Sequence, residues 1–301
     1  MQLSNRLGRL NLTFVALTSL ACSSAVHALP QTADDPKPAA ATTQKEAPLP
    51  TAKEIVAKMI EFQGGEKVLA SPKPIHAVGS FSVPMMNLTG KLETWSAPPN
   101  YLLVQMDIPA MGGMSSQGFN GKVGWAIDPI NGARILEGAM LKSVARDADQ
   151  RGDLDLFKVY DSVKVTGREK FQDVDCVVLE LKADDTTTLR FVDPTTGRMV
   201  GSRSIMPTPQ GDIPVETVIA EWKTVNGRTT PVDTRMTMMG MEQVMKIDTL
   251  EVESSDPKRF ALPPAIEALV AEAEKNATKK GEKLEKKDST PAEENSKTGG
   301  E

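Results

Sequence analysis

The chain has few of the residues on which most catalytic and metal sites depend. Its 301 residues include two histidines and two cysteines. His27 and Cys22 lie near the amino terminus, which leaves His76 and Cys176 for the rest of the chain. A nucleophile with a histidine base, or a zinc site with several histidines, would have to be built on His76 alone. The sequence therefore predicts a protein that is not an enzyme and has no catalytic residue, metal or cofactor.

Further absences exclude other kinds of site. Cys176 has no cysteine partner in the folded region, so no intramolecular disulfide is expected, and its strand-like surroundings favour inert packing. Gly112-Gly113 opens no helix and precedes no Lys-Ser or Lys-Thr pair, so no phosphate loop is expected. The net charge is −5 and the sequence shows no basic stripe interleaved with aromatics, so nucleic acid is not an expected partner.

The first 28 residues have the pattern of a secretory signal peptide. Arg6 and Arg9 precede a mostly apolar run from 10 to 21, and a cut after Ala28 would release the mature chain. The run is shorter than the ~20 apolar residues that span a bilayer. Ser19 to Cys22 also forms a partial lipobox, and a cut before Cys22 would leave a lipid anchor on its thiol. We expect a periplasmic or envelope protein, either soluble with peripheral membrane contact or tethered as an outer-membrane lipoprotein.

Composition divides the remaining chain into three parts. Residues 29–50 hold five prolines among alanines, threonines and charged residues, which predicts a disordered linker. Residues 266–301 are rich in charges of both signs and contain no aromatic residue, which predicts a disordered tail. Residues 51–265 are then one folded domain, long enough for one sizeable core.

Periodicity within residues 51–265 predicts a mainly β domain. Thr51 and Glu54 form a capping box before a helix that ends at Gly64-Gly65, and a second helix is expected between 138 and 153. Alternating patterns predict antiparallel strands at 75–83, 88–95, 100–107, 113–119, 122–128, 133–136, 161–169, 174–182, 186–193, 198–206, 213–224, 232–239 and 243–252. So many strands imply a strongly curved sheet or open half-barrel of α+β class, whose concave face the two helices cover.

A hairpin predicted at residues 115–129 has large apolar side chains on one strand opposite mostly smaller ones on the other. Asn120-Gly121 predicts a two-residue type I′ turn in which Phe119 pairs with Lys122. Val123, Trp125 and Ile127 would then lie opposite the smaller or more flexible Gly118, Ser116 and Met114. This face is either closed by a packed core or left open as an apolar trough, and the pattern allows both.

The order of several turn motifs resembles a known family. These motifs are Ser96 to Asn100, Gly118 to Pro129, Asp193 to Gly197 and Trp222 to Gly227, and they resemble the landmarks of outer membrane lipoprotein-sorting proteins. Phe119, Asn120 and Trp222 replace residues that are often tyrosine, aspartate and tyrosine in that family. The family is similar to the periplasmic lipoprotein carriers LolA and LolB. The resemblance spans most of 51–260 and implies an open half-barrel whose helices plug a groove that accepts acyl chains.

The sequence thus supports two hypotheses for function. In the first, a non-enzymatic protein holds acyl chains of a lipid or lipoprotein in an apolar groove, in envelope lipoprotein sorting. In the second, the groove is filled by the protein's own side chains, and the chain is an envelope interaction or sensor domain with a protein partner. The candidate groove residues are Met114, Val123, Trp125, Ile127, Met140, Leu141, Val144, Met236 and Met238.

Overall fold

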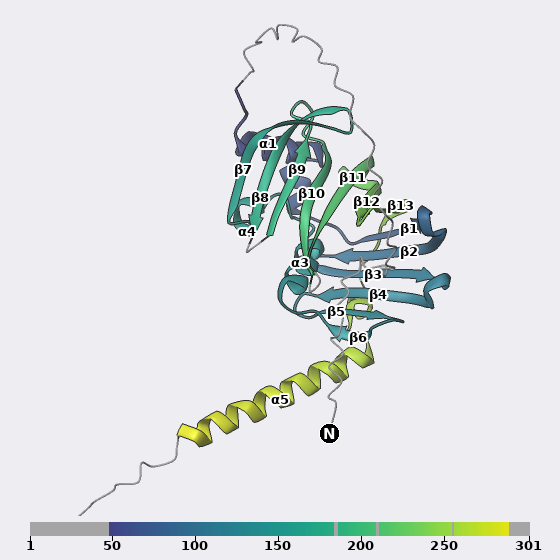
Figure 1. Cartoon of the computed structure of the whole chain (residues 1–301), viewed down its shortest axis with the longest axis vertical. Coiled ribbons are helices and arrows are strands. Elements are labelled where there is room, and N and C mark those ends of the chain that lie inside the picture. The colour runs from purple at the N-terminus through teal and green to yellow at the C-terminus, as the bar shows by residue number, and fades with distance from the viewer. Residues whose placement is uncertain (1–47, 184–185, 209–210, 255, 289–301) are drawn as a thin grey trace, which may run out of the picture. The chain divides into compact units, whose positions relative to one another are not determined.

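The computed structural model describes residues 48–183, 186–208, 211–254 and 256–288 (Figure 1). The chain divides into two compact units. Unit 1 comprises residues up to 70 and residues 153–244, and unit 2 comprises residues 71–152 and those from 245 onward. The signal peptide, most of the linker and Cys22 lie outside the described residues, so the predictions made for them stay predictions.

Unit 1 contains three helices, the strands β7 to β12 and the beginning of β13. Its helices are α1 (Ala52–Phe62), α2 (Glu66–Ala70) and α4 (Leu156–Val159). Its strands are β7 (Ser162–Phe171), β8 (Val174–Ala183), β9 (Thr186–Val192), β10 (Met199–Thr208), β11 (Gly211–Val225), β12 (Arg228–Met238) and the beginning of β13 (Met241–Val252). The short helices α2 and α4 were not predicted.

Unit 2 contains the first six strands and the carboxyl-terminal segment. Its strands are β1 (Ile75–Val83), β2 (Leu88–Ala97), β3 (Tyr101–Ile108), β4 (Gly113–Asn120), β5 (Gly124–Asp128), β6 (Gly132–Ile135) and the remainder of β13. Its helical elements are η1 (Pro84–Met86), η2 (Pro109–Met111), α3 (Gly138–Ala148), η3 (Pro257–Phe260) and α5 (Pro264–Asp288).

The thirteen strands share one hydrogen-bonded sheet. Their order is β6-β5-β4-β3-β2-β1-β13-β12-β11-β10-β9-β8-β7, so β13 contributes to both units. Neighbouring strands run antiparallel wherever a register is resolved, as in β1–β2 and β7–β8. Within the described residues the sheet does not close, because β6 and β7 end the order. The predicted mainly β, open antiparallel fold is confirmed, and each predicted strand is present within a few residues of its expected limits.

Helix α1 packs on the sheet of unit 1 as its pattern requires. The Thr51 hydroxyl accepts a hydrogen bond from the Glu54 amide at 3.3 Å, and a Glu54 carboxylate oxygen accepts one from the Thr51 amide at 2.7 Å. The predicted capping box is therefore present. The buried face of α1, formed by Ile55, Val56 and Met59, contacts the buried strand residues Val177, Leu179, Leu181 and Val192.

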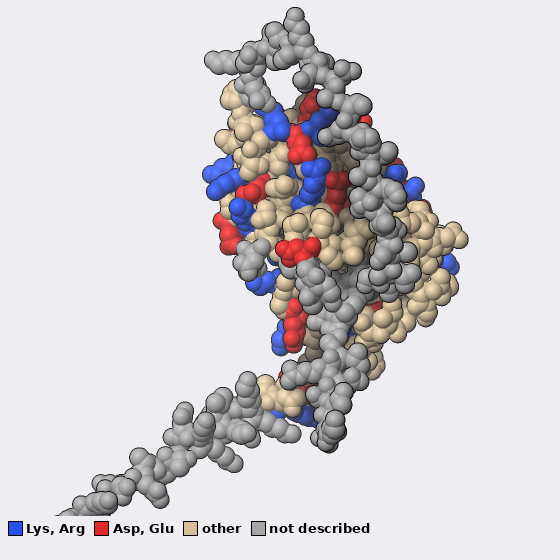
Figure 2. Space-filling view, in the orientation of Figure 1, with Lys and Arg blue, Asp and Glu red and all other residues tan. Residues whose placement is uncertain are grey.

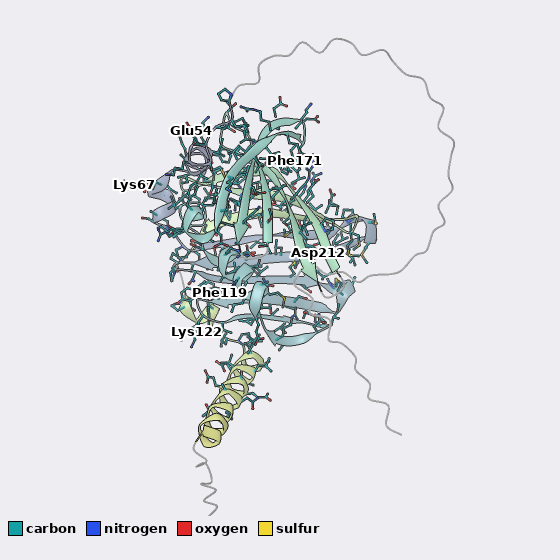
Figure 3. All side chains as sticks on the ribbon, turned by 60° about the vertical axis from the view of Figure 1, so that its left-hand side comes forward. Glu54, Lys67, Phe119, Lys122, Phe171 and Asp212 are labelled. Carbon is teal, nitrogen blue, oxygen red and sulfur yellow. The ribbon has the colours of Figure 1, made fainter. Side chains whose placement is uncertain are left out.

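The β4–β5 hairpin corrects the predicted two-residue turn. Phe119 pairs with Gly124, not with Lys122, so four residues form the loop. Phe119 and Lys122 are labelled in Figure 3. Gly121 alone in the Asn120-Gly121 pair has positive φ, at 87°. The Asn120 side-chain oxygen accepts hydrogen bonds from the amides of Lys122 and Val123 at 3.1 and 2.8 Å. This side-chain cap stabilises a longer loop, which moves the register by two residues but leaves each side chain on its predicted face.

A type I′ turn does occur at another Asn-Gly pair, Asn226-Gly227. Asn226 and Gly227 have φ of 50° and 81°, and Val225 pairs directly with Arg228 across the turn. The same dipeptide thus forms a two-residue turn here and part of a four-residue loop in β4–β5.

Part of the predicted disordered tail is a helix among the described residues. Residues from 266 were expected to be disordered, but helix α5 runs from Pro264 to Asp288. Ile266 is completely buried, and Leu269 and Val270 are partly buried against unit 2. These three apolar residues give the first turns of the helix a packing surface that the high charge of the later residues obscured. None of the helices among the described residues is long and apolar enough to cross a membrane.

Candidate functional site

The face of β5 that carries Trp125 is tightly packed. Trp125 lies opposite Gly118 and is 4% exposed. A Cβ atom on Gly118 would lie 2.6 Å from Cε2 and Cζ2 of the indole. The sequence predicted Trp125 opposite Ser116 and Val123 opposite Gly118; the shifted register instead places the indole over Gly118, where it occupies the space above the glycine.

The protein's own carboxyl-terminal segment covers this face. Phe260 and Ile266 pack in one buried cluster with Trp95, Leu103 and Trp125. Val123 and Ile127, the other predicted groove residues on this face, are partly buried against the same cluster. Of the two arrangements that the sequence left open, a packed face and an open trough, the structure has the packed one around Trp125.

The predicted residues of α3 lie on the opposite face of the unit 2 sheet. Val144 is buried in a cluster with Phe119 and Ala126, and Met140 and Leu141 pack against that cluster. Consecutive strand residues point to opposite faces, so Trp125 and Ala126 face away from each other. The structure therefore does not bring the α3 residues together with Trp125 as walls of one groove.

The other three predicted methionines belong to different units. Met114 in β4 of unit 2 is 53% exposed. Met236 and Met238 alternate along β12 of unit 1 and so share one sheet face, and Met238 is 2% exposed. Among the nine predicted groove residues, Met114 is the one large apolar side chain that is more than half exposed.

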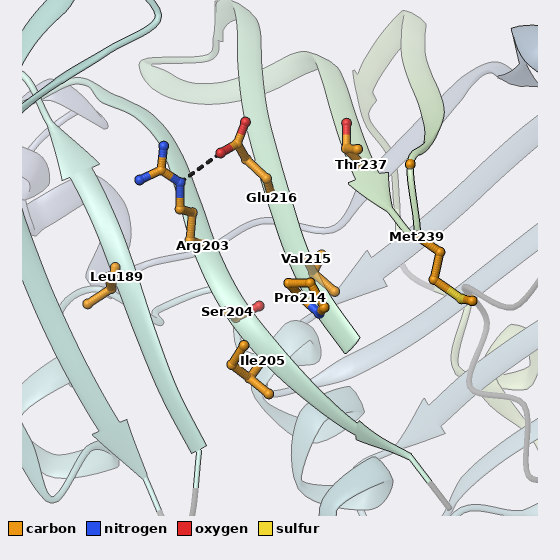
Figure 4. A pocket seen from close by; sticks show the side chains of 10 residues that line it. Leu189, Arg203, Ser204, Ile205, Pro214, Val215, Glu216, Thr237 and Met239 are labelled. Carbon is orange, nitrogen blue, oxygen red and sulfur yellow. Dashed lines mark hydrogen bonds and ion pairs between the residues drawn. The ribbon is translucent and has the colours of Figure 1, made fainter. Parts of the chain in front are cut away.

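Unit 1 contains a hollow that the sequence did not reveal. It has a volume of about 560 Å³ and lies over β9 to β12 and the turn that follows (Figure 4). Its lining residues are Leu189, Arg203, Ser204, Ile205, Pro214, Val215, Glu216, Thr237, Met239 and Gly240. Cross-strand register places Leu189 beside Arg203, Arg203 beside Glu216, and Glu216 beside Thr237. Only this register reveals that these residues share one face.

The walls of the hollow are largely aliphatic. Ile205 and Met239 are 46% and 57% exposed, although both are large apolar residues. The guanidinium of Arg203 donates from Nε to Glu216 at 2.7 Å. In Figure 4, Arg203, Glu216 and Thr237 lie toward one end of the hollow and Ile205 toward the other. This arrangement can hold an apolar chain beside a polar group.

The groups that could support catalysis are paired or buried. Burial raises the pKa of the Cys176 thiol to about 11, so the thiol stays protonated at neutral pH. His76 is half-buried, and its ring stacks on that of Trp95 with the ring centroids 4.9 Å apart, while its Nε2 lies 2.8 Å from a Glu93 carboxylate oxygen. No group of three or more potential metal ligands occurs in the part of the chain that the structure describes.

Charged side chains of both signs are mixed with uncharged ones on the visible surface of unit 1. In Figure 2, blue and red side chains alternate over the region of β7 to β10. The ion pairs of Arg203 with Glu169 and Glu216 belong to this region. Mixed charge of this kind gives no extended field of one sign to attract a polyanion.

No protein-family model and no curated protein matches the sequence. Solved structures do resemble the fold. A DUF1329 family protein from Desulfovibrio piger has a TM-score of 0.50 at 15% identity, over 70% of this chain and 97% of its own.

Two further solved structures are a LolA superfamily protein and a lipoprotein-sorting domain. A LolA superfamily protein from Nitrosomonas europaea has a TM-score of 0.49 at 15% identity, over 71% of this chain and 99% of its own. An outer membrane lipoprotein-sorting protein domain from Vibrio parahaemolyticus has a TM-score of 0.45 at 11% identity, over 68% of this chain and 94% of its own. At 15% identity, the match to the Desulfovibrio piger structure shows a similar fold and nothing further.

Proposed function

We propose that this protein is an exported, non-enzymatic binding protein that holds acyl chains of a lipid or lipoprotein. The observation that carries the proposal is the hollow over β9 to β12, with its exposed aliphatic walls. Its volume of about 560 Å³ is typical of small-molecule sites, and its mixture of aliphatic residues with one ion pair is typical of their linings. Burial of each CH₂ group of a chain would contribute about 0.8 kcal/mol.

The proposed site differs from the groove predicted from the sequence. Trp125 is covered by the carboxyl-terminal segment, whereas Ile205 and Met239 are open to an incoming chain. A role in envelope lipoprotein sorting extends the proposal, and the names of the similar solved structures suggest it. Mass spectrometry of the mature amino terminus tests export: a free Leu29 indicates a soluble protein and a lipid on Cys22 a tethered one.

Binding can be measured with dodecyl maltoside, an uncharged alkyl probe, kept below its micelle concentration. Native mass spectrometry and calorimetry should show one chain bound to the wild-type protein. Ile205→Asn should weaken binding about tenfold, because a buried aliphatic contact is worth about 1.5 kcal/mol or more. Ile130→Asn is the matched control, since Ile130 is 56% exposed and lies in unit 2 outside the hollow. A protein that is purified without lipid and takes up no probe would refute the proposal.

A second candidate is an envelope interaction or sensor domain. It is favoured by one observation, that the face around Trp125 is filled by the protein's own Phe260 and Ile266. This candidate predicts that the protein purified from cells carries no bound lipid and co-purifies with one envelope protein in fixed stoichiometry. Removal of residues 271–301 should abolish that association while Ile266 keeps its contacts. Retention of the partner by the truncated protein would argue against it.

A further inference from the structure

The hollow of unit 1 has a fixed charged group at one end. The Arg203 guanidinium contacts two carboxylates, with Nε 2.7 Å from Glu216 and an NH group 2.6 Å from Glu169. It also lies over the rings of Phe171 and Phe191, at 5.2 and 4.8 Å from their centroids. The two rings stack at 4.1 Å. These contacts hold the guanidinium against the sheet and engage its Nε and one of its two terminal NH₂ groups, which restricts its movement toward a ligand.

The charges of this group do not cancel. One guanidinium and two carboxylates give a net charge of −1. The hydrogen bonds that Arg203 donates to Glu216 and Glu169 raise its pKa, so it stays charged. Arg203 and Glu216 are the charged residues among the ten that line the hollow, so no second cation lies in its described wall. The nearest guanidinium along β12, that of Arg235, lies 3.6 Å from the Asp233 carboxylate.

We propose that the hollow selects an alkyl chain whose head group is positively charged and disfavours one with an anionic head group, such as a free fatty-acid carboxylate. The chain would lie along Ile205, Pro214 and Met239, and the cationic group would lie beside Glu216. This proposal rests on the proposed function, because it names the chemistry of the ligand for the same site. The charge pattern favours the cation, because one guanidinium faces two carboxylates and the group keeps a net charge of −1 beside the hollow.

The test compares three probes with the same twelve-carbon chain. They are uncharged dodecyl maltoside, cationic dodecyltrimethylammonium and anionic dodecanoate, each titrated into the full mature chain below its micelle concentration at neutral pH. At low ionic strength the cation should bind at least about 10-fold more tightly than the anion, as expected for one net charge close to the head group. An ionic strength of about 0.5 M should reduce this ratio, because it shortens the Debye length to a few ångströms.

Two substitutions change the charge in opposite directions. Glu216→Gln removes the net charge and should bring the cation-to-anion ratio to within about 3-fold, whereas Arg203→Gln makes it more negative and should increase the ratio. Glu221→Gln is the matched control, because Glu221 is an exposed residue of the same strand outside the hollow. It should leave the ratio unchanged.

The possible outcomes separate this inference from the proposed function. If dodecyl maltoside binds but the wild-type protein binds cation and anion equally, the inference is refuted and the proposed function stands. The inference is also refuted if Glu216→Gln and Glu221→Gln leave the same ratio. If none of the three probes binds, both proposals fail.

Discussion

The contact between Gly118 and Trp125 gives a sharp test of how unit 2 is packed. Gly118→Ala places a methyl carbon 2.6 Å from two indole carbons. Carbon atoms in contact normally lie about 3.5–4.0 Å apart, so the indole must move by about 1 Å. Trp125 is 4% exposed and has Phe260 and Ile266 in the same cluster, so there is little room for that movement. We expect Gly118→Ala to lower the free energy of unfolding by about 2–3 kcal/mol.

The measurement is urea denaturation followed by far-ultraviolet circular dichroism and tryptophan fluorescence. Gly167→Ala is the matched control, because no atom lies within 4 Å of a Cβ at that position and its φ is not positive. It should change stability by less than about 1 kcal/mol. Trp125→Leu removes the ring, so the cost of Gly118→Ala should be at least about 1 kcal/mol smaller in that background. Full stability of Gly118→Ala, or strictly additive costs in the double mutant, would refute the reasoning.

Three other predictions concern unit 1. Asp153 accepts hydrogen bonds from Gln63 and Arg190, and the Arg190 side chain is 19% exposed. Asp153→Asn would leave this largely buried guanidinium without its charged partner and should lower the free energy of unfolding by about 3 kcal/mol in urea denaturation. A change below about 1 kcal/mol, as expected for the control Asp173→Asn at an exposed residue, would contradict this. Burial acts to raise the pKa of Asp193, but hydrogen bonds from Thr196 and Thr195 outweigh burial and lower that pKa. The ionised Asp193 carboxylate therefore contributes to the free energy of unfolding above the pKa that it has in the unfolded chain. This contribution is lost as pH falls through the lower pKa that it has in the folded protein. Asp193→Asn should therefore flatten the stability profile below about pH 4, and an unchanged acid limb would argue against the turn. Cys176 should react with a thiol reagent only after unfolding, and rapid labelling of the native protein would contradict its burial.

The sequence predicted the strands well because their alternation and turn residues are local signals. The capping box of Thr51 and Glu54 and the turn at Asn226-Gly227 depend on a few neighbouring residues, and both are confirmed. The strand register predicted from Asn120-Gly121 was wrong by two residues, because the Asn120 side chain caps a longer loop. Two turn geometries of similar energy are open to the same dipeptide, and local sequence does not decide between them.

The site could not be predicted in the same way, because it depends on contacts between distant residues. The groove residues proposed around Trp125 share a strand face, but periodicity does not say which element covers that face. The structure places Ile266, more than a hundred residues away, on Trp125. Likewise, Leu189 and Glu216 come together only through the register of β9, β10 and β11, in which both lie beside Arg203.

The sequence by itself determined that this is a mainly β chain with one cysteine and one histidine between residues 51 and 265. It also determined which side chains share a face, because the two-residue period of a strand survives a register change of two. Only the tertiary structure decided which faces are covered and which stay open. Trp125 became part of a packed core and Ile205 part of an exposed hollow, because coverage depends on where distant segments pack.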